Sequence, residues 1–216
     1  SIDPTVTRRG SRQVCKTAVM RVHLVRHGEV ENPEHVVYAN LPGFGLSAKG
    51  REQAATAGRH LAATTLSTIV TSPLDRAIET SEIISGATGA GIEVDDRLVE
   101  WGLASHWAGV GWERLPEVFP GELEAYLSRP DDLPFSPESL SRVTERVAAA
   151  VEDWARRASS AIAFVSHEDP LHAARIALTK ETPEEFHRDK PTHCSVTTLE
   201  GRPGKWSLAV YWEPAQ

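Results

Sequence analysis

Two arginines, two histidines and a glutamate of this 216-residue chain follow apolar segments and could act together on a phosphate. They are Arg26, His27, Arg76, Glu100 and His167. Guanidinium groups present paired donors that fit the oxygens of a phosphate, and a neutral imidazole is a nucleophile near neutral pH. These residue types therefore predict phosphoryl transfer to a histidine, provided that the fold brings them together.

Features beside these residues suit the same chemistry. Gly28, directly after the first histidine, would leave space for a ligand to approach the backbone. A helix start predicted at 72–75 would add oriented N–H groups and a partial positive charge, and Ser72 is there either a ligand contact or the helix cap. The sequence has no Asp, Glu and His grouping at the spacing of metal ligands. We therefore expect no metal ion and no cofactor, so cationic side chains would neutralise the phosphate.

Taken singly, each of these residues has an ordinary explanation. An arginine and a histidine at a strand end often only cap the sheet. Arg76 could pair with Glu79 on a helix surface, and Glu100 could belong to a stretch of surface charge. The combination favours a site, because the residues follow different predicted strands.

The elements that would position these residues can be predicted from the pattern of apolar residues. Strands are expected at 20–25, 68–70, 92–94, 161–165, 195–199 and 207–212. Helices are expected at about 48–63, 73–86, 138–157 and 169–178. Such alternation is typical of an α/β domain with a mostly parallel sheet, and a turn at 201–204 should join the last two strands as an edge hairpin. Because ligands bind outside the carboxyl ends of parallel strands, the site residues would meet in one crevice there.

The region at 104–137 breaks this alternation, because it is interrupted by prolines and has no clear strand. Its aromatic residues are Trp107, Trp112, Phe119, Tyr126 and Phe135. We interpret it as a helical cap inserted into a single domain that spans 20–216. Cap side chains such as Trp107 and Trp112 would select the substrate, which the sequence does not identify.

Composition and charge narrow the class of protein. The chain is 40% hydrophobic and 25% charged, as in ordinary globular domains, and no apolar run approaches the ~18 residues of a membrane span. Its net charge of −7 argues against non-specific binding to nucleic acid. Residues 1–19 lack the apolar core of a secretory signal and are expected to form a flexible tail. Cys15 and Cys194 form no framework, so free thiols and a cytoplasmic location are expected.

Several stretches together resemble the histidine phosphatase superfamily, also called the phosphoglycerate mutase-like family. They are LVRHGE at 24–29, LSAKGREQA at 46–54, TSPLDRAIETSEII at 71–84, RLVEWGLASHWAG at 97–109 and FVSHEDPLHAAR at 164–175. The resemblance covers about 20–212. It implies a three-layer α/β/α fold with a mostly parallel sheet and the inserted cap.

The resemblance also implies a role for each site residue. His27 would be the nucleophile that becomes phosphorylated. Arg26, Arg76 and His167 would hold the phosphoryl group. Glu100 would donate a proton to the leaving oxygen and would then act as the base that activates water.

The chain departs from the family at one position. Many members have an asparagine where this chain has Pro33, and the nearest asparagine is Asn32, one position earlier. We expect Asn32 to reach the substrate through a shifted loop. Ser72 is a second expected substrate contact, besides its possible role as a helix cap.

These features together predict a metal-independent phosphatase that acts on a small phosphorylated metabolite through a phosphohistidine on His27. The cap favours a closed pocket for a small molecule, with no nucleic acid and no membrane as a partner. A phosphoglycerate mutase-type phosphotransferase is an alternative, weakened because 100–115 lack the stretch typical of mutases. A non-catalytic protein that binds a phosphorylated ligand is another. Whether the chain forms a homodimer is left open.

Overall fold

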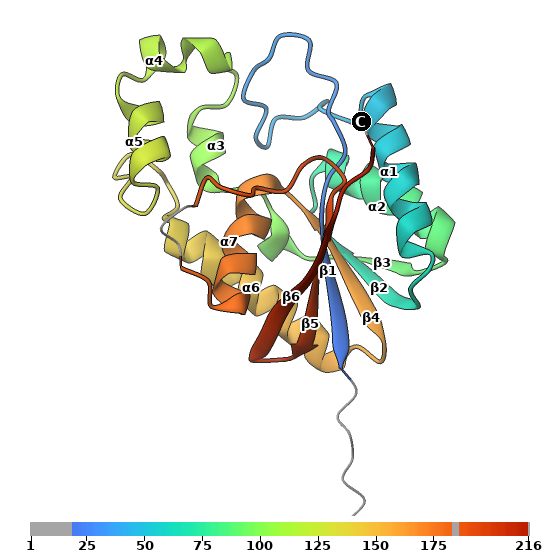
Figure 1. The fold of residues 1–216 in the computed structure, drawn as a ribbon. Coiled ribbons are helices and arrows are strands. Elements are labelled where there is room, and N and C mark those ends of the chain that lie inside the picture. The colour runs from blue at the N-terminus through green and yellow to red at the C-terminus, as the bar shows by residue number, and fades with distance from the viewer. Residues whose placement is uncertain (1–18, 183–185, 216) are drawn as a thin grey trace, which may run out of the picture.

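The computed structural model describes residues 19–182 and 186–215 of the chain. Figure 1 shows one central sheet with helices on both of its sides. The tail expected at 1–19 lies outside the described residues, apart from Val19. In the described ranges, no helix is both long enough and apolar enough to cross a membrane.

The sheet is mixed and has six strands in the order β3-β2-β4-β1-β5-β6. Its parallel strands are β1 (Met20–Arg26), β2 (Leu66–Thr71), β3 (Gly91–Val94) and β4 (Ala161–Ser166). β5 (Val196–Arg202) runs antiparallel to β1, and β6 (Lys205–Trp212) pairs with β5 at the edge of the sheet. The predicted mostly parallel sheet and edge hairpin are therefore confirmed. The predicted turn is too long, since β5 leaves only Pro203 and Gly204 for it.

Backbone pairing aligns the carboxyl ends of three strands. Val25 of β1 and Thr71 of β2 both pair with Val165 of β4. β4 lies between β1 and β2, and its interior residues are buried, which explains its uninterrupted apolar run. The residues that follow these three strands therefore start from the same edge of the sheet.

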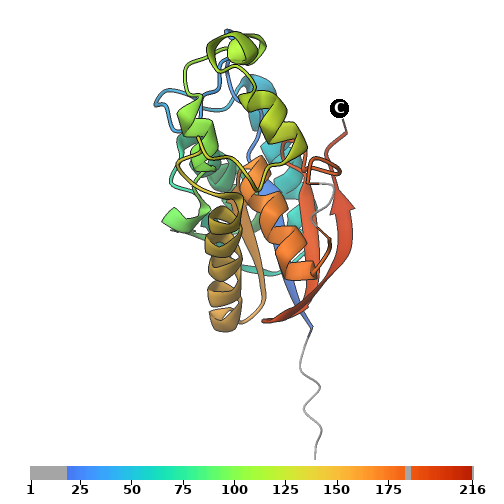
Figure 2. The ribbon, with the colours of Figure 1, turned by 90° about the vertical axis from the view of Figure 1, so that its left-hand side faces the viewer.

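Helices cover both faces of the sheet and complete the expected three layers. α1 (Ala48–Leu61) and α2 (Asp75–Thr88) lie on one face, and α6 (Leu140–Arg157) and α7 (Glu168–Thr179) lie on the other (Figures 1 and 2). Successive residues of a strand point to opposite faces. The core is accordingly divided into two clusters of buried side chains, one beneath each pair of helices.

The starts of α1 and α2 are fixed in different ways. Ser47 caps α1, as its Oγ accepts a hydrogen bond of 3.0 Å from Gly50 N. α2 begins at Asp75 and has no side-chain cap, so a helix-capping role for Ser72 is not what the structure shows. The Ser72 hydroxyl lies 3.4 Å from Leu74 N, ahead of the helix, and is directed toward the site described below.

The segment between β3 and α6 forms the helical cap expected at 104–137. It contains α3 (Gly102–His106), α4 (Leu115–Val118) and α5 (Glu122–Ser128), which lie beyond the carboxyl ends of the strands at the upper left of Figure 1. Buried side chains of the cap join the cluster beneath α6 and α7. The cap and the sheet therefore share one hydrophobic core.

The long loop after β1 is joined to the cap by backbone hydrogen bonds. Gly109 N donates to Val37 O at 2.9 Å, Val37 N donates to Val110 O at 2.9 Å, and Trp112 N donates to His35 O at 3.1 Å. Figure 1 shows this loop, in blue, beside the green helices of the cap. The loop and the cap together form a roof over the strand ends.

Candidate active site

The residues that could act on a phosphate converge at the carboxyl edge of the sheet. Arg26 ends β1, and His27 follows it. Arg76 lies in the first turn of α2, and His167 follows β4 at the start of α7. Glu100 lies between β3 and the cap, with Oε2 3.9 Å from Arg76 Nη2 and 3.7 Å from His167 Nδ1. The ring centroids of the two histidines are 5.2 Å apart, so the fold brings all five residues together.

His27 has one ring nitrogen tied to the backbone and one directed into the site. Nδ1 lies 2.8 Å from Gly28 O. A carbonyl oxygen can only accept, so Nδ1 carries the hydrogen and the lone pair is on Nε2. The side chain is 1% exposed, and burial, with Arg76 and Arg26 nearby, holds the pKa of His27 well below its usual value. The ring is therefore neutral near pH 7, as a nucleophile must be.

Gly28 has a role that the sequence does not indicate. A Cβ at this position would come within 2.5 Å of Gly50 O, so the glycine is required where α1 packs against the loop. Its expected role in admitting a ligand stays a prediction. The Gly28 N–H donates to Thr80 Oγ1 of α2 at 3.0 Å. The backbone next to the candidate nucleophile is therefore held by both α1 and α2.

Arg76 is a buried cation that does not use all of its nitrogens in hydrogen bonds with the described residues. Its Nε donates to His27 Nε2 at 3.2 Å, and its guanidinium lies 4.8 Å from the centre of the Tyr38 ring. Nη2 is buried and has no hydrogen-bond partner among the described residues. Burial lowers the pKa of Arg76, and the nearby Glu100 opposes this. Such an unsatisfied buried donor is costly to keep unless a ligand supplies an acceptor.

Arg26 is partly neutralised before any ligand binds. Its Nη1 pairs with a carboxylate oxygen of Glu168 and donates to Pro191 O at 2.9 Å. Its Nε is buried and has no partner within the described part of the chain. The charge of Arg26 is thus shared with Glu168, while one donor is left for an anion.

His167 is fully buried and is positioned by Ser72. The Ser72 hydroxyl and His167 Nε2 share a hydrogen bond of 2.8 Å. Nδ1, on the other side of the ring, has no hydrogen-bond partner in residues 19–182 and 186–215. Burial, followed by the charge of Arg76, lowers the pKa of His167 well below its usual value. Ser72 therefore sets the orientation of His167, whereas its direct contact with substrate stays a prediction.

Glu100 has the properties of a general acid. Burial raises the pKa of its carboxyl to about 7, although Arg76 acts in the opposite direction. Trp101 N donates to Oε1 at 2.8 Å, and Arg146 of α6 donates to the main-chain oxygen of Glu100 at 3.1 Å. The side chain is 16% exposed and reaches the cavity described below. A carboxyl with a pKa near 7 can hold a proton at neutral pH and also give it up.

Asn32 is used within its own loop. Its side chain donates from Nδ2 to Val36 O at 2.9 Å and accepts from Val36 N at 3.2 Å. It does not line the cavity beside His27. The predicted contact between Asn32 and substrate stays a prediction, and this geometry gives the side chain a structural task instead.

A cavity of about 280 Å³ opens beside His27 beneath the roof. Arg26, His27 and Glu100 line it at the sheet edge, whereas Arg76 and His167 lie buried behind them. The rest of its lining comes from the loop, the cap, the start of α7 and His193 in the segment before β5. A larger cavity of about 410 Å³ lies between α7 and the β5–β6 hairpin, and none of the five candidate residues lines it.

The structure also brings to the cavity residues that the sequence did not suggest. They are Tyr38, Glu168, Asp169 and His193, and they join Tyr126, one of the cap aromatics named above. Glu168 and Asp169 directly follow His167, so their place in the motif could have identified them. Tyr38 and His193 lie in long loops without a periodic pattern, and nothing in the sequence indicates that they fold back onto His27.

Known proteins resemble this chain over most of its length. The model of the histidine phosphatase superfamily (branch 1) matches residues 22–213. The uncharacterized protein Rv0525 of Mycobacterium tuberculosis is 33% identical over 207 residues, which cover 90% of this chain and 96% of that protein. Phosphoserine phosphatase 1 of Hydrogenobacter thermophilus is 30% identical over 164 residues, or 74% of this chain and 76% of that protein.

A solved structure has a similar fold over nearly the whole chain. The mycobacterial glucosyl-3-phosphoglycerate phosphatase Rv2419c, in complex with VO3, superposes with a TM-score of 0.80 and 27% sequence identity. The match covers 91% of this chain and 100% of that one. The three-layer architecture is therefore that of known phosphatases.

Proposed function

This chain belongs to the histidine phosphatase superfamily, and from that premise we propose that it hydrolyses a small phosphorylated metabolite through a phosphohistidine on His27, without a metal ion. The names of two similar proteins, a phosphoserine phosphatase and a glucosyl-3-phosphoglycerate phosphatase, support a phosphatase that acts on a small molecule.

One observation carries the proposal. A neutral His27 ring lies among three buried nitrogen atoms, Arg26 Nε, Arg76 Nη2 and His167 Nδ1, that make no hydrogen bond in the described part of the chain. The nearest carboxylate oxygen, Glu100 Oε2, stays 3.9 Å from Arg76 Nη2 and 3.7 Å from His167 Nδ1. Leaving buried polar groups unsatisfied costs about 1–3 kcal/mol for each group. A phosphoryl group offers several acceptor oxygens at one point, so binding it would recover this cost where the reaction takes place.

In the first step, the lone pair of His27 Nε2 attacks phosphorus. The N–P bond forms as the bond from phosphorus to the ester oxygen breaks, and Glu100 gives its proton to the departing oxygen. The hydrogen bond from Nδ1 to Gly28 O supports the positive charge that develops on the ring. Arg76 would hold the transferred group, since its Nε already lies 3.2 Å from the attacking nitrogen.

In the second step, the roles of acid and base are exchanged. The Glu100 carboxylate takes a proton from water, the water oxygen attacks phosphorus, and the N–P bond breaks with its electron pair returning to His27 Nε2. Inorganic phosphate leaves, and Glu100 is again protonated. One carboxyl can serve both steps because its pKa lies near the working pH.

The test is hydrolysis of 4-nitrophenyl phosphate by the purified chain in the presence of a chelator. We expect release of phosphate, loss of activity in His27→Ala, and an acid-labile phosphoryl group on the wild-type protein after rapid quenching. His60→Ala is the matched control, because His60 lies on α1 and stacks on Trp212 away from the cavity. It should retain activity.

The same experiment separates the alternatives. Full activity of His27→Ala would contradict the mechanism. Transfer of the phosphoryl group between the hydroxyls of phosphoglycerate, faster than its release, would indicate a mutase. Tight binding of phosphate without turnover would indicate a binding protein.

A further inference from the structure

The cavity beside His27 is apolar and aromatic away from the sheet edge. Its apolar and aromatic lining residues are Val37, Tyr38, Ala39, Trp101, Leu103, Ala104, Trp107, Trp112 and Tyr126. Because His27 and Glu100 line the same cavity, this wall would surround the alcohol part of a substrate. Its chemistry therefore indicates which alcohol the site accepts.

The aromatic rings of this wall are held in place before a ligand binds. Trp107 is 2% exposed, and its Nε1 donates to Glu122 at 2.8 Å. Tyr126 meets Trp107 edge-to-face with 5.6 Å between ring centroids, and Trp112 does so at 6.3 Å. Trp112 is 44% exposed and also lines the cavity. A rigid aromatic surface of this kind favours planar or apolar groups.

The charged groups that line the cavity are mainly acidic. Glu100, Glu168 and Asp169 line it; burial raises the pKa of Glu100 to about 7, so this carboxyl is partly protonated at neutral pH, and Asp169 is held by Lys190. Arg26 is the one lysine or arginine in the lining among the described residues. Arg26 is paired with Glu168 and belongs to the phosphoryl end of the cavity. His193 adds no positive charge, because burial and Arg26 lower its pKa to about 4.

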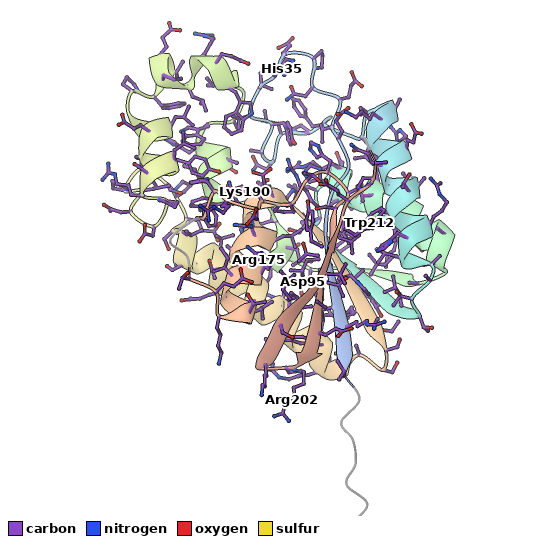
Figure 3. The ribbon with its side chains drawn as sticks, viewed as in Figure 1. His35, Asp95, Arg175, Lys190, Arg202 and Trp212 are labelled. Atoms are coloured by element: carbon purple, nitrogen blue, oxygen red, sulfur yellow. The ribbon has the colours of Figure 1, made fainter. Side chains whose placement is uncertain are left out.

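Lys190, labelled in Figure 3, does not change this balance. Its Nζ lies 2.5 Å from Asp169 and 3.4 Å from Glu168, and it donates to Tyr126 OH at 2.6 Å. The ammonium group is thus held by acids and is not part of the cavity lining. A carboxylate on the alcohol part of a substrate would meet aromatic rings or carboxylates, at a cost in desolvation and repulsion.

We propose that the substrate is a phosphomonoester of a small aromatic or aliphatic alcohol that carries no carboxylate. This inference rests on the proposed phosphatase function and narrows it. A cavity of about 280 Å³ is at the lower end of the usual range for ligand sites and suits a single ring or a short branched chain. The substrates in the names of the two similar phosphatases contain carboxylates, so the preference expected here is different.

The decisive experiment compares phenyl phosphate with 4-carboxyphenyl phosphate, which differ only in the carboxylate. We expect kcat/KM for phenyl phosphate to be higher by about tenfold or more, because the wall offers a buried carboxylate no cation that is not already paired with an acid. Phosphoserine and 3-phosphoglycerate should be poorer still, as they lack the ring and carry the charge. His27→Ala is measured with each substrate to exclude background hydrolysis.

Variants of the wall test its two properties separately. Ala104→Arg places a guanidinium in the half-buried wall, and Asp169→Asn removes an acid. Each variant should raise kcat/KM for 4-carboxyphenyl phosphate relative to kcat/KM for phenyl phosphate. For Ala104→Arg this ratio should rise by about tenfold. Trp112→Ala should lower kcat/KM for phenyl phosphate. Trp212→Ala should not, since Figure 3 shows Trp212 next to α1, and its ring stacks on His60 outside the cavity.

The outcomes distinguish this inference from the function on which it rests. Preferred hydrolysis of carboxylated substrates that depends on His27 would overturn the substrate class and leave the phosphatase in place. If none of these esters is hydrolysed in a way that depends on His27, both the substrate class and the phosphatase function are overturned. Unchanged selectivity in folded Ala104→Arg and Asp169→Asn would show that charge does not set the preference.

Discussion

Arg76 donates from Nε to Nε2 of His27 over 3.2 Å, so a buried cation rests on the lone pair of the proposed nucleophile. Burial of the ring and this contact together keep the imidazole neutral, because burial disfavours its charged form and a positive neighbour opposes its protonation. It also places Arg76 beside any group that becomes bonded to this nitrogen. Arg76 thus helps to keep the nucleophile neutral and would then bind the phosphoryl group attached to it.

Replacing Arg76 with methionine should separate activity from stability. We expect kcat/KM to fall by about 10²–10³-fold, since a donor directed at the transferred group is lost. The free energy of unfolding should rise by about 1 kcal/mol or more, because a buried cation with one nitrogen that makes no hydrogen bond is replaced by an apolar chain. Steady-state kinetics and thermal unfolding measure the two effects.

Arg51→Met is the matched control for this change. Arg51 is exposed on α1 and pairs with Glu79 outside the cavity. Both kinetics and stability should stay close to wild type. A loss of stability in Arg76→Met comparable to its loss of activity would show that Arg76 serves the fold rather than the site.

The proton held by Glu100 should be visible in the pH dependence. The first step needs the protonated carboxyl, whose pKa is raised to about 7, so kcat/KM for an ester with a poor leaving group should fall as pH increases through about 7. Glu100→Gln should lose about 10²–10⁴-fold with such an ester and less with 4-nitrophenyl phosphate, whose leaving group needs little protonation. Ionisation of the substrate affects both proteins alike, so the ratio of their profiles reports Glu100. A ratio independent of pH would rule out Glu100 as the acid.

Ser72→Ala should reduce catalysis by disturbing His167. The hydroxyl shares a 2.8 Å hydrogen bond with His167 Nε2, so its loss leaves a buried ring nitrogen unpaired and the ring free to turn. We expect a loss of about tenfold in kcat, measured with 4-nitrophenyl phosphate. Ser81→Ala is a suitable control, since Ser81 is equally buried in α2 but donates to Ala77 O. Equal effects of the two changes would assign Ser72 a purely structural role.

Asn32→Ala decides between two roles for this side chain. Its hydrogen bonds to Val36 close the loop that meets the cap, so the geometry predicts a rise in KM by about threefold to tenfold with kcat nearly unchanged. A direct contact with the phosphoryl group would instead lower kcat. A fall in kcat of more than about tenfold would therefore support the contact suggested by the family resemblance.

Much of the fold could be predicted from the sequence because its elements are strongly patterned. The apolar run of β4 and the turn residues before β6 are local signals, and both the strand and the turn are found in the structure, the turn being shorter than predicted. The convergence of His27 and His167 followed from parallel strands that end at one edge. These inferences needed no knowledge of side-chain packing.

Contacts across long loops could not be predicted in the same way. Tyr38 reaches Arg76 from the loop after β1, and His193 reaches His27 from the segment before β5. Neither segment has a hydrophobic periodicity that would indicate which way its side chains point. Serine is a residue type that often caps helices, but the Ser72 hydroxyl forms a hydrogen bond with His167, 95 positions away. Tertiary contacts outweigh local preference in each case.

Gly28 and Gly50 meet backbone to backbone, since a Cβ at Gly50 would come within 2.0 Å of Glu29 O and a Cβ at Gly28 within 2.5 Å of Gly50 O. The nucleophile is therefore registered against α1, a helix that contributes no side chain to the five candidate residues. A single added methyl group at Gly50 would push the imidazole out of line with its ligand. Such a substitution would lower the catalytic rate although it changes none of the five candidate residues. The packing of α1 against the loop therefore sets the reaction geometry.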